Sequence, residues 1–209
     1  LKWTNSQEMN HNTGHISSFN ISLKKDASAK YNSFEFGGGF VRNDIHTHFD
    51  APNGDCEINS LFIPNGKQHI DISTMVHHKN PLCSSRQLVK GILGGNSTAV
   101  FRGLANVYKE AGKTDAQQNN KNLILSPNAR VNSIPQLEIY EDDVKCSHGS
   151  TTGQIEEEAL FYLQSRGINR TDAMGLMVRG FANEVVDKVE NQDMKEYIQN
   201  SLIQKMEGM

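Results

Sequence analysis

A cysteine and a histidine two residues apart are the most chemically suggestive pair in the 209-residue sequence. Cys146 and His148 lie in the segment EDDVKCSHGSTTGQ, residues 141–154. Side chains two apart on a β-strand point to the same side, so this thiol and imidazole could approach one metal ion or one sulfur species. Two ligands do not close a metal site. The spacing alone therefore favours a small buried thiol beside a hydrogen-bonded histidine.

The other histidines and cysteines are interpreted first as structural. His46 and His48 form a His-x-His pair on one face of an expected strand, but the sequence fixes no third ligand near this metal-compatible spacing. A solvated or hydrogen-bonded pair is the simpler interpretation. The adjacent His77 and His78 must diverge on a strand, and Cys83, in a turn, is interpreted as a small buried apolar group.

The glycine run at residues 37–39 raises the question of a phosphate-binding loop. It lacks the Lys-Ser or Lys-Thr pair and the helix that follow such a loop, so we interpret it as a corner of the chain. We therefore expect ATP to bind on another protein.

Composition excludes several classes of protein. The apolar fraction is 36%, and no stretch approaches the roughly 18 to 20 apolar residues that cross a bilayer, so we expect no membrane partner. A net charge of -3 offers no basic field for phosphate contacts, which makes nucleic acid an unexpected partner. Three cysteines without a CxxC pair indicate a reducing compartment. Because no secretory signal opens the sequence at Leu1, we predict a cytoplasmic protein.

The first 150 residues have the composition of strands and turns. All five prolines and most asparagines lie there, between short β-branched or aromatic runs. We predict strands at residues 19–23, 31–36, 41–49, 57–63, 69–76, 86–93, 98–107, 122–125, 136–140 and 144–148. Ten short strands without intervening helices predict an all-β body. Many Asn and Gly corners with a modest apolar fraction favour a β-solenoid, although no repeat of fixed length is visible.

Residues 151–209 are predicted to be helical. Gly167 is an expected C-cap of the first helix, and Asn169 with Asp172 is the expected start of the second. The second helix is predicted to place Ala173, Leu176, Met177, Phe181, Val185 and Val189 along one face. A third begins near residue 193. Sixty residues are too few for a large core of their own, so these helices are expected to pack on the β body, on a partner, or on both.

Two long segments make the sequence recognisable. The run NPLCSSRQLVKGILGG (80–95) and the run from Thr114 to Ile168, which contains CSHG, strongly resemble the SufB/SufD family of iron-sulfur cluster assembly proteins, in its SufD branch. The resemblance extends from about residue 36 to 181. It implies a mainly β fold: a right-handed parallel β-helix, here residues 1–150, followed by a small C-terminal α-helical domain, residues 151–209. It also implies that the N-terminal helical region of the family is absent, so the chain is expected to be a C-terminal fragment.

The resemblance also implies partners and a site. Family members are non-catalytic scaffold subunits in which SufD pairs with SufB through the ends of their β-helices, and each binds one SufC ATPase through its C-terminal helices. The histidine implicated in cluster assembly at the partner interface falls on His148, with Cys146 two residues before it. The cysteine and glutamate pattern of SufB is missing here. The chain alone is therefore expected to hold no metal and no stable cofactor, the cluster being transient with SufB and the ATP on SufC.

For the helices, the resemblance implies contact with SufC. Phe161, Tyr162 and Arg166 are of the types expected to anchor an interface, and Met177 and Phe181 could contribute, although apolar stripes at helical spacing are by default internal packing. Two alternatives remain open, a β-solenoid enzyme and a stand-alone metal-binding module. The sequence also leaves open whether the isolated chain forms a homodimer.

Overall fold

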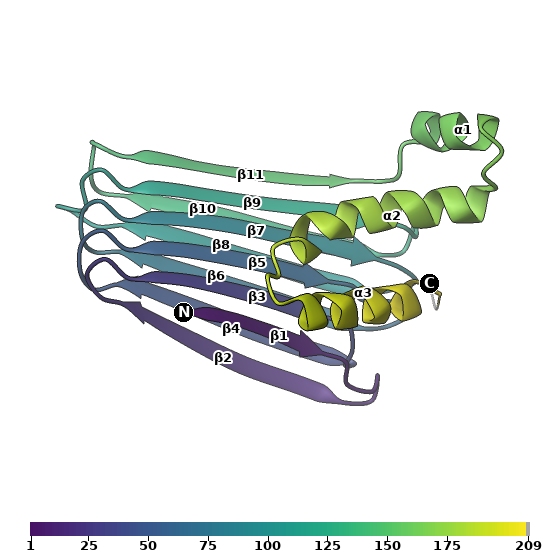
Figure 1. Ribbon diagram of the computed structural model, residues 1–209, viewed down its shortest axis with the longest axis horizontal. Coiled ribbons are helices and arrows are strands. Elements are labelled where there is room, and N and C mark those ends of the chain that lie inside the picture. The colour runs from purple at the N-terminus through teal and green to yellow at the C-terminus, as the bar shows by residue number, and fades with distance from the viewer. Residues whose placement is uncertain (208–209) are drawn as a thin grey trace.

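The chain folds as a parallel β-solenoid of about five turns, which confirms the predicted fold class (Figure 1). A computed structural model describes residues 1–207. Its strands are β1 (Lys2–Gln7), β2 (Gly14–Leu23), β3 (Ser28–Glu35), β4 (Phe40–Phe49), β5 (Asp55–Phe62), β6 (His69–His78), β7 (Ser84–Leu93), β8 (Thr98–Val107), β9 (Asp115–Ile124), β10 (Arg130–Ile139) and β11 (Lys145–Gly153). The odd-numbered strands form one parallel sheet, ordered from β1 to β11 and here called sheet A, and the even-numbered strands form sheet B.

Successive coils differ in length, which explains why no fixed repeat is visible in the sequence. Gly14 of β2 pairs with Phe40 of β4, 26 residues on, whereas Thr98 of β8 pairs with Arg130 of β10, 32 residues on. The variation lies in the corners between strands. The strands themselves keep an alternating pattern, in which every second side chain points into the solenoid.

Each of the ten predicted segments overlaps one strand, several of which begin or end five or more residues beyond the prediction, and β1 was not predicted. Strand β9 begins earlier than predicted. The prediction missed its first residues because they are polar. Its side chains Gln118 and Asn120 nevertheless point inward and are buried. A polar interior of this kind hides a strand from an analysis that searches for apolar alternation.

The helices are α1 (Glu157–Ser165), α2 (Arg170–Val186) and α3 (Gln192–Glu207). Helices α2 and α3 lie against the outer face of sheet A, whereas α1 projects beyond the ends of the strands (Figure 1). The predicted caps are correct: the backbone N–H of Asp172 donates to the Asn169 side chain at 2.9 Å, and Gly167 has a φ of 87°. Among residues 1–207, no helix has both the length and the apolar character needed to cross a bilayer.

The helices share one apolar core with sheet A. Phe34, Leu61 and Ile92 point outward from neighbouring strands and are fully buried by the helices. The helical residues that cover them include Val178, Ala182, Val185, Val186, Ile198 and Leu202. The predicted buried face of α2 is therefore partly wrong: Leu176 is 44% exposed and Met177 only half-buried, because the sheet contacts the neighbouring stripe that contains Val178 and Ala182.

Candidate functional site

The last coil of the solenoid, formed by β10 and β11, is open. These two strands end their sheets, and within residues 1–207 no further strand pairs with their outer edges. Inward-facing residues of β10 are half-buried or exposed, and β11 is almost wholly exposed, in contrast to the buried interior of earlier coils. The chemistry-bearing segment recognised in the sequence thus lies at an uncapped end of the fold.

His148 lies in the middle of β11. It pairs in register with Gln118 of β9, whose side chain is buried inside the solenoid, so the imidazole occupies the next inward-facing position along the stack. The side chain is exposed. No hydrogen bond or ion pair joins its ring to any of the residues that the structure describes. A neutral imidazole with a free nitrogen can bind a metal ion or accept a proton.

The side-chain amide of Gln118 lies next to His148 in the stack and is polar. Its Nε2 donates to Gln87 at 3.5 Å, while its Oε1 is buried without a partner among the described residues. A β-carbon on Gly103, across the interior on β8, would lie 2.0 Å from Gln118 Nε2, so any larger residue there would displace this amide from its present position. A glycine inside a strand marks such close approaches, and it was the one signal in the sequence that could have revealed the position.

Cys146 lies on the same side of β11 as His148, as the two-residue spacing predicts. It is half-buried beside Ala116, its partner on β9. Burial raises the pKa of the Cys146 thiol, and the backbone of Ala116 only partly opposes this effect. The sulfur is therefore held in its protonated form at neutral pH, in which it is a weak nucleophile and a poor metal ligand.

A line of hydroxyl and amide groups continues inward from the open coil. Ser133 Oγ of β10 donates to Asn120 Oδ1 at 2.7 Å and lies 2.8 Å from Ser150 Oγ of β11. Asn122 Nδ2 donates to Thr152 Oγ1 at 3.3 Å. Sequence reasoning missed these residues, although Ser150 and Thr152 continue the alternation that begins at Cys146. These groups make the open end of the solenoid hydrophilic rather than hydrophobic.

The remaining candidates from the sequence take structural positions. His48 and His77 stack on the outer face of sheet B with centroids 4.7 Å apart, while His78 points inward, is buried and lies 2.9 Å from Ser85 Oγ. Cys83 is buried, as interpreted. No group of three or more His, Cys, Asp or Glu residues in the described part of the chain is arranged to hold a metal ion.

The helical residues expected at an interface divide into two sets. Phe161 and Tyr162 of α1 are 71% and 57% exposed, and the guanidinium of Arg166 lies over the Tyr162 ring, 5.3 Å from its centroid. Phe181 of α2 instead packs toward sheet A, where the ammonium of Lys90 lies 4.1 Å from its ring centroid. Half-buried Met177 lies on the same helix, outside the main buried stripe.

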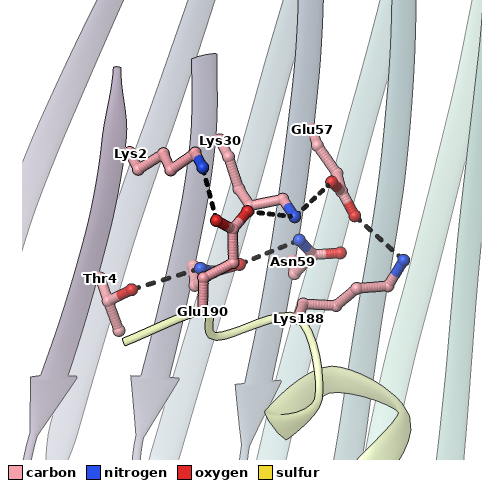
Figure 2. A network of polar contacts seen from close by, with 8 residues as sticks. Lys2, Thr4, Lys30, Glu57, Asn59, Lys188 and Glu190 are labelled. Carbon is pink, nitrogen blue, oxygen red and sulfur yellow. Dashed lines mark hydrogen bonds and ion pairs between the residues drawn. The ribbon is translucent and has the colours of Figure 1, made fainter. Parts of the chain in front are cut away.

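Charges as well as apolar contacts join the helices to sheet A. Figure 2 shows a network of ion pairs between lysines and glutamates. Glu190, which follows α2, pairs with Lys2 and Lys30. Glu57 of β5 pairs with Lys30 and Lys188, at 3.0 and 3.1 Å. A second contact is more buried. The side chain of Lys90 is 3% exposed, forms an ion pair with Glu184 of α2, and donates to the carbonyl oxygen of Phe181 at 2.8 Å.

Comparison with known proteins places these features in a family. The family model for the SUF system FeS cluster assembly SufBD core domain matches residues 1–181. The chain belongs to the SufB/SufD family. The iron-sulfur cluster assembly protein SufD of Escherichia coli is 40% identical over 194 residues, 93% of this chain, which identifies the SufD branch.

Other relatives agree. An iron-sulfur cluster assembly SufBD family protein of Mycobacterium leprae is 36% identical over 87% of the chain, and the SufD protein of Plasmodium falciparum is 29% identical over 97%. The chain spans about half the length of the bacterial relatives, 46% of the E. coli protein and 48% of the M. leprae protein.

Cys146 should be the most reactive thiol of this SufD-branch chain. Cys56 and Cys83 are each 1% exposed, and burial raises the pKa of Cys56 to about 12. Titration of the native protein with a chromogenic disulfide should therefore show one accessible thiol. It should react more slowly than free cysteine at pH 7.5, because its raised pKa lowers the thiolate fraction. Cys146→Ser should remove this phase and Cys83→Ser should leave it, whereas a fast phase in Cys146→Ser would contradict the assignment.

Glu184→Gln should weaken the attachment of α2 to sheet A. It leaves the buried Lys90 without its carboxylate, and the expected loss is about 1 to 2 kcal/mol, below that of a fully buried pair because Glu184 is half-exposed. Partial burial acts to raise the pKa of Glu184, but Lys90 and Lys121 hold it below its ordinary value of 4.5. The loss of unfolding free energy in Glu184→Gln should therefore be complete at pH 7. It should shrink as the pH falls below about 4.5, where Glu184 of the unchanged protein also loses its charge.

Urea unfolding followed by circular dichroism measures this difference. Glu110→Gln, on an exposed corner, is the matched control and should change the unfolding free energy by less than about 0.5 kcal/mol. An equal effect of the two substitutions would show that the Lys90 contact does not hold the helix.

Proposed function

We propose that this chain is the scaffold part of a SufD-like subunit that takes part in iron-sulfur cluster assembly and does no chemistry of its own. The observation that carries the proposal is the exposed, unpartnered imidazole of His148 on the inner side of an open solenoid coil. A second β-solenoid of the SufB type, placed against β10 and β11, would cover this coil and enclose the imidazole in an interface.

The chemistry of this end supports a shared site. The chain offers one imidazole and one protonated thiol, two fewer donors than the four that a tetrahedral iron or zinc ion takes. Iron or sulfide would therefore be held as a transient substrate only when SufB supplies the remaining ligands. A metal or a cation from the partner would also lower the pKa of Cys146, which burial raises in the free chain.

The helices suit a different partner. We place the SufC ATPase, which would carry the ATP, on the exposed aromatic surface of α1, a helix that projects beyond the ends of the strands and presents Phe161 and Tyr162. Movement of α1 and α2 would reach sheet A through the Lys90 and Glu184 contact and the shared core. Because β11 is the last strand of sheet A, the same motion would reach His148 and open or close the junction with SufB.

His148→Ala in the full-length subunit should leave complex formation intact and impair cluster assembly at least tenfold, because the exposed ring forms no hydrogen bond or ion pair with the described residues that would hold the fold. The measurement is co-purification with SufB and SufC, followed by anaerobic reconstitution of the cluster and its visible absorption. Ser147→Ala, on the opposite face of the same strand, is the matched control and should assemble the cluster normally. Unchanged assembly in His148→Ala would reject the site.

Phe161→Asp should reduce co-purification of the SufC-type ATPase without changing that of the SufB-type subunit. Charge on a 71% exposed aromatic side chain does not unfold α1 but opposes burial in an apolar interface. Leu82→Asp is the control, because Leu82 is 56% exposed on a corner between β6 and β7, distant from the helices. Normal ATPase binding by Phe161→Asp would place this partner elsewhere.

A further inference from the structure

A cleft of about 750 Å³ lies where the carboxyl ends of the sheet A strands meet α3. Its walls are the β1–β2 loop (residues 8–12), the corners at residues 36–39 and 65–68, and residues 201–205 of α3. The volume falls in the range of small-molecule sites. This cleft is at the opposite end of the coil stack from the open coil, near β1 and β3, so the assembly site does not account for it.

Lys205 in this cleft differs from the other partly buried lysines. Lys30 pairs with Glu57 and Glu190, and Lys90 pairs with Glu184. The ammonium of Lys205 instead donates to Gln68 Oε1 at 2.8 Å, and no carboxylate among the described residues lies within ion-pair distance of it. A partly buried cation with a neutral partner is incompletely compensated, and a bound anion would remedy this.

Gln68 is fixed and cannot take over the role of a counter-ion. Its Oε1 also accepts the backbone N–H of Asn65 at 2.8 Å, and its Nε2 donates to the carbonyl of Gly38. The amide thus holds one N–H of Lys205 in place. Lys has three donors and no acceptor, and the two remaining N–H groups of the ammonium have no partner among residues 1–207, so a ligand could accept them.

The rest of the cleft offers further hydrogen-bond donors to an anion. Lys67 and His11 line it beside the Ser201 hydroxyl and the Gln204 amide. The lining carboxylate, Glu8, already accepts from Ser6 Oγ at 3.1 Å. The lining residues therefore carry a net positive charge even with the histidine neutral.

Glycines shape one wall of this cleft. A β-carbon on Gly37 would lie 2.3 Å from the backbone of Met9, and one on Gly39 would lie 2.1 Å from the carbonyl oxygen of His11. Only glycine lets the β1–β2 loop approach the corner so closely. The glycine run is therefore a corner, as interpreted from the sequence, and it also forms one wall of the cleft.

We propose that this cleft binds a small molecule that carries a phosphate or carboxylate group, with Lys205 as the charge partner of the oxyanion. Lys67 and the polar side chains of α3 would contribute further donors, in the way that charge-assisted hydrogen bonds hold oxyanions. Because burial lowers the pKa of Lys205 in the free protein, binding of an anion should raise it again. Affinity should consequently fall as the pH rises above that lowered pKa, because the ammonium that pairs with the oxyanion is then lost.

Isothermal titration of the full chain with glycerol 3-phosphate, inorganic phosphate or citrate, at constant ionic strength in chloride, tests the proposal. We expect at least one of these probes to bind, and the ranking of the phosphates against citrate identifies the anion class. Lys205→Met should weaken binding at least tenfold. Lys109→Met, at an exposed corner where the ammonium has no hydrogen-bond or ion-pair partner within residues 1–207, should change it less than twofold. Failure of all three probes to bind more tightly than chloride, or equal affinity in Lys205→Met, would overturn the proposal.

A second variant covers the case in which Lys205→Met does not fold, which an amide NMR spectrum would show. Lys67 is exposed, so Lys67→Met should fold normally and should weaken binding of the best probe about threefold. Unchanged affinity in this variant would then count against the site.

Discussion

In a stacked-strand solenoid, an inward-facing side chain is buried only when adjacent coils cover it, and the rest of this structure depends on that constraint. Every second side chain of each strand points inward, and it is covered only if a further coil lies above and below it. Ile58 and Ile72, in central coils, are completely buried, whereas the inward positions of β10 and β11 are not. An uncovered coil therefore follows from the architecture itself. The fold leaves inward-facing groups available at its end without any dedicated pocket.

The two outer faces of the solenoid have different roles. Sheet A carries apolar outward residues such as Leu61 and Ile92, which need the cover that α2 and α3 provide. Sheet B carries charge there instead: Asp71 lies between Arg42 and Arg102, at 3.6 and 3.0 Å. The helices can therefore pack well on one sheet only, and it is the sheet that ends in β11. The helices therefore pack on the same sheet whose last strand lies at the open coil.

The sequence predicted what local periodicity controls. Strand β4 alternates cleanly, Asn169 caps its helix, and Cys146 and His148 share a face. Features that need partners distant in the chain were not predictable. The predicted buried stripe of α2 was right at Ala173 and Val185 but wrong at Leu176, because sheet A selects which side chains it covers. Lys90 likewise meets a helix about ninety residues away. The polar interior that contains Gln118 was missed because buried amides are read as surface residues unless their own partners are known.

The open coil also limits what the chain can do alone. The β10 positions that face β11 across the interior include Ser133, Pro135 and Leu137, none of which is a soft metal ligand. Capture of iron by this chain would therefore rest on His148 and on a thiol that must first lose its proton against the effect of burial. Each missing ligand and the unfavourable deprotonation weaken binding to the free subunit. Under the proposed function, a partner that brought both ligands and positive charge would remove both penalties at once, and the affinity for metal would then be a property of the junction rather than of either chain.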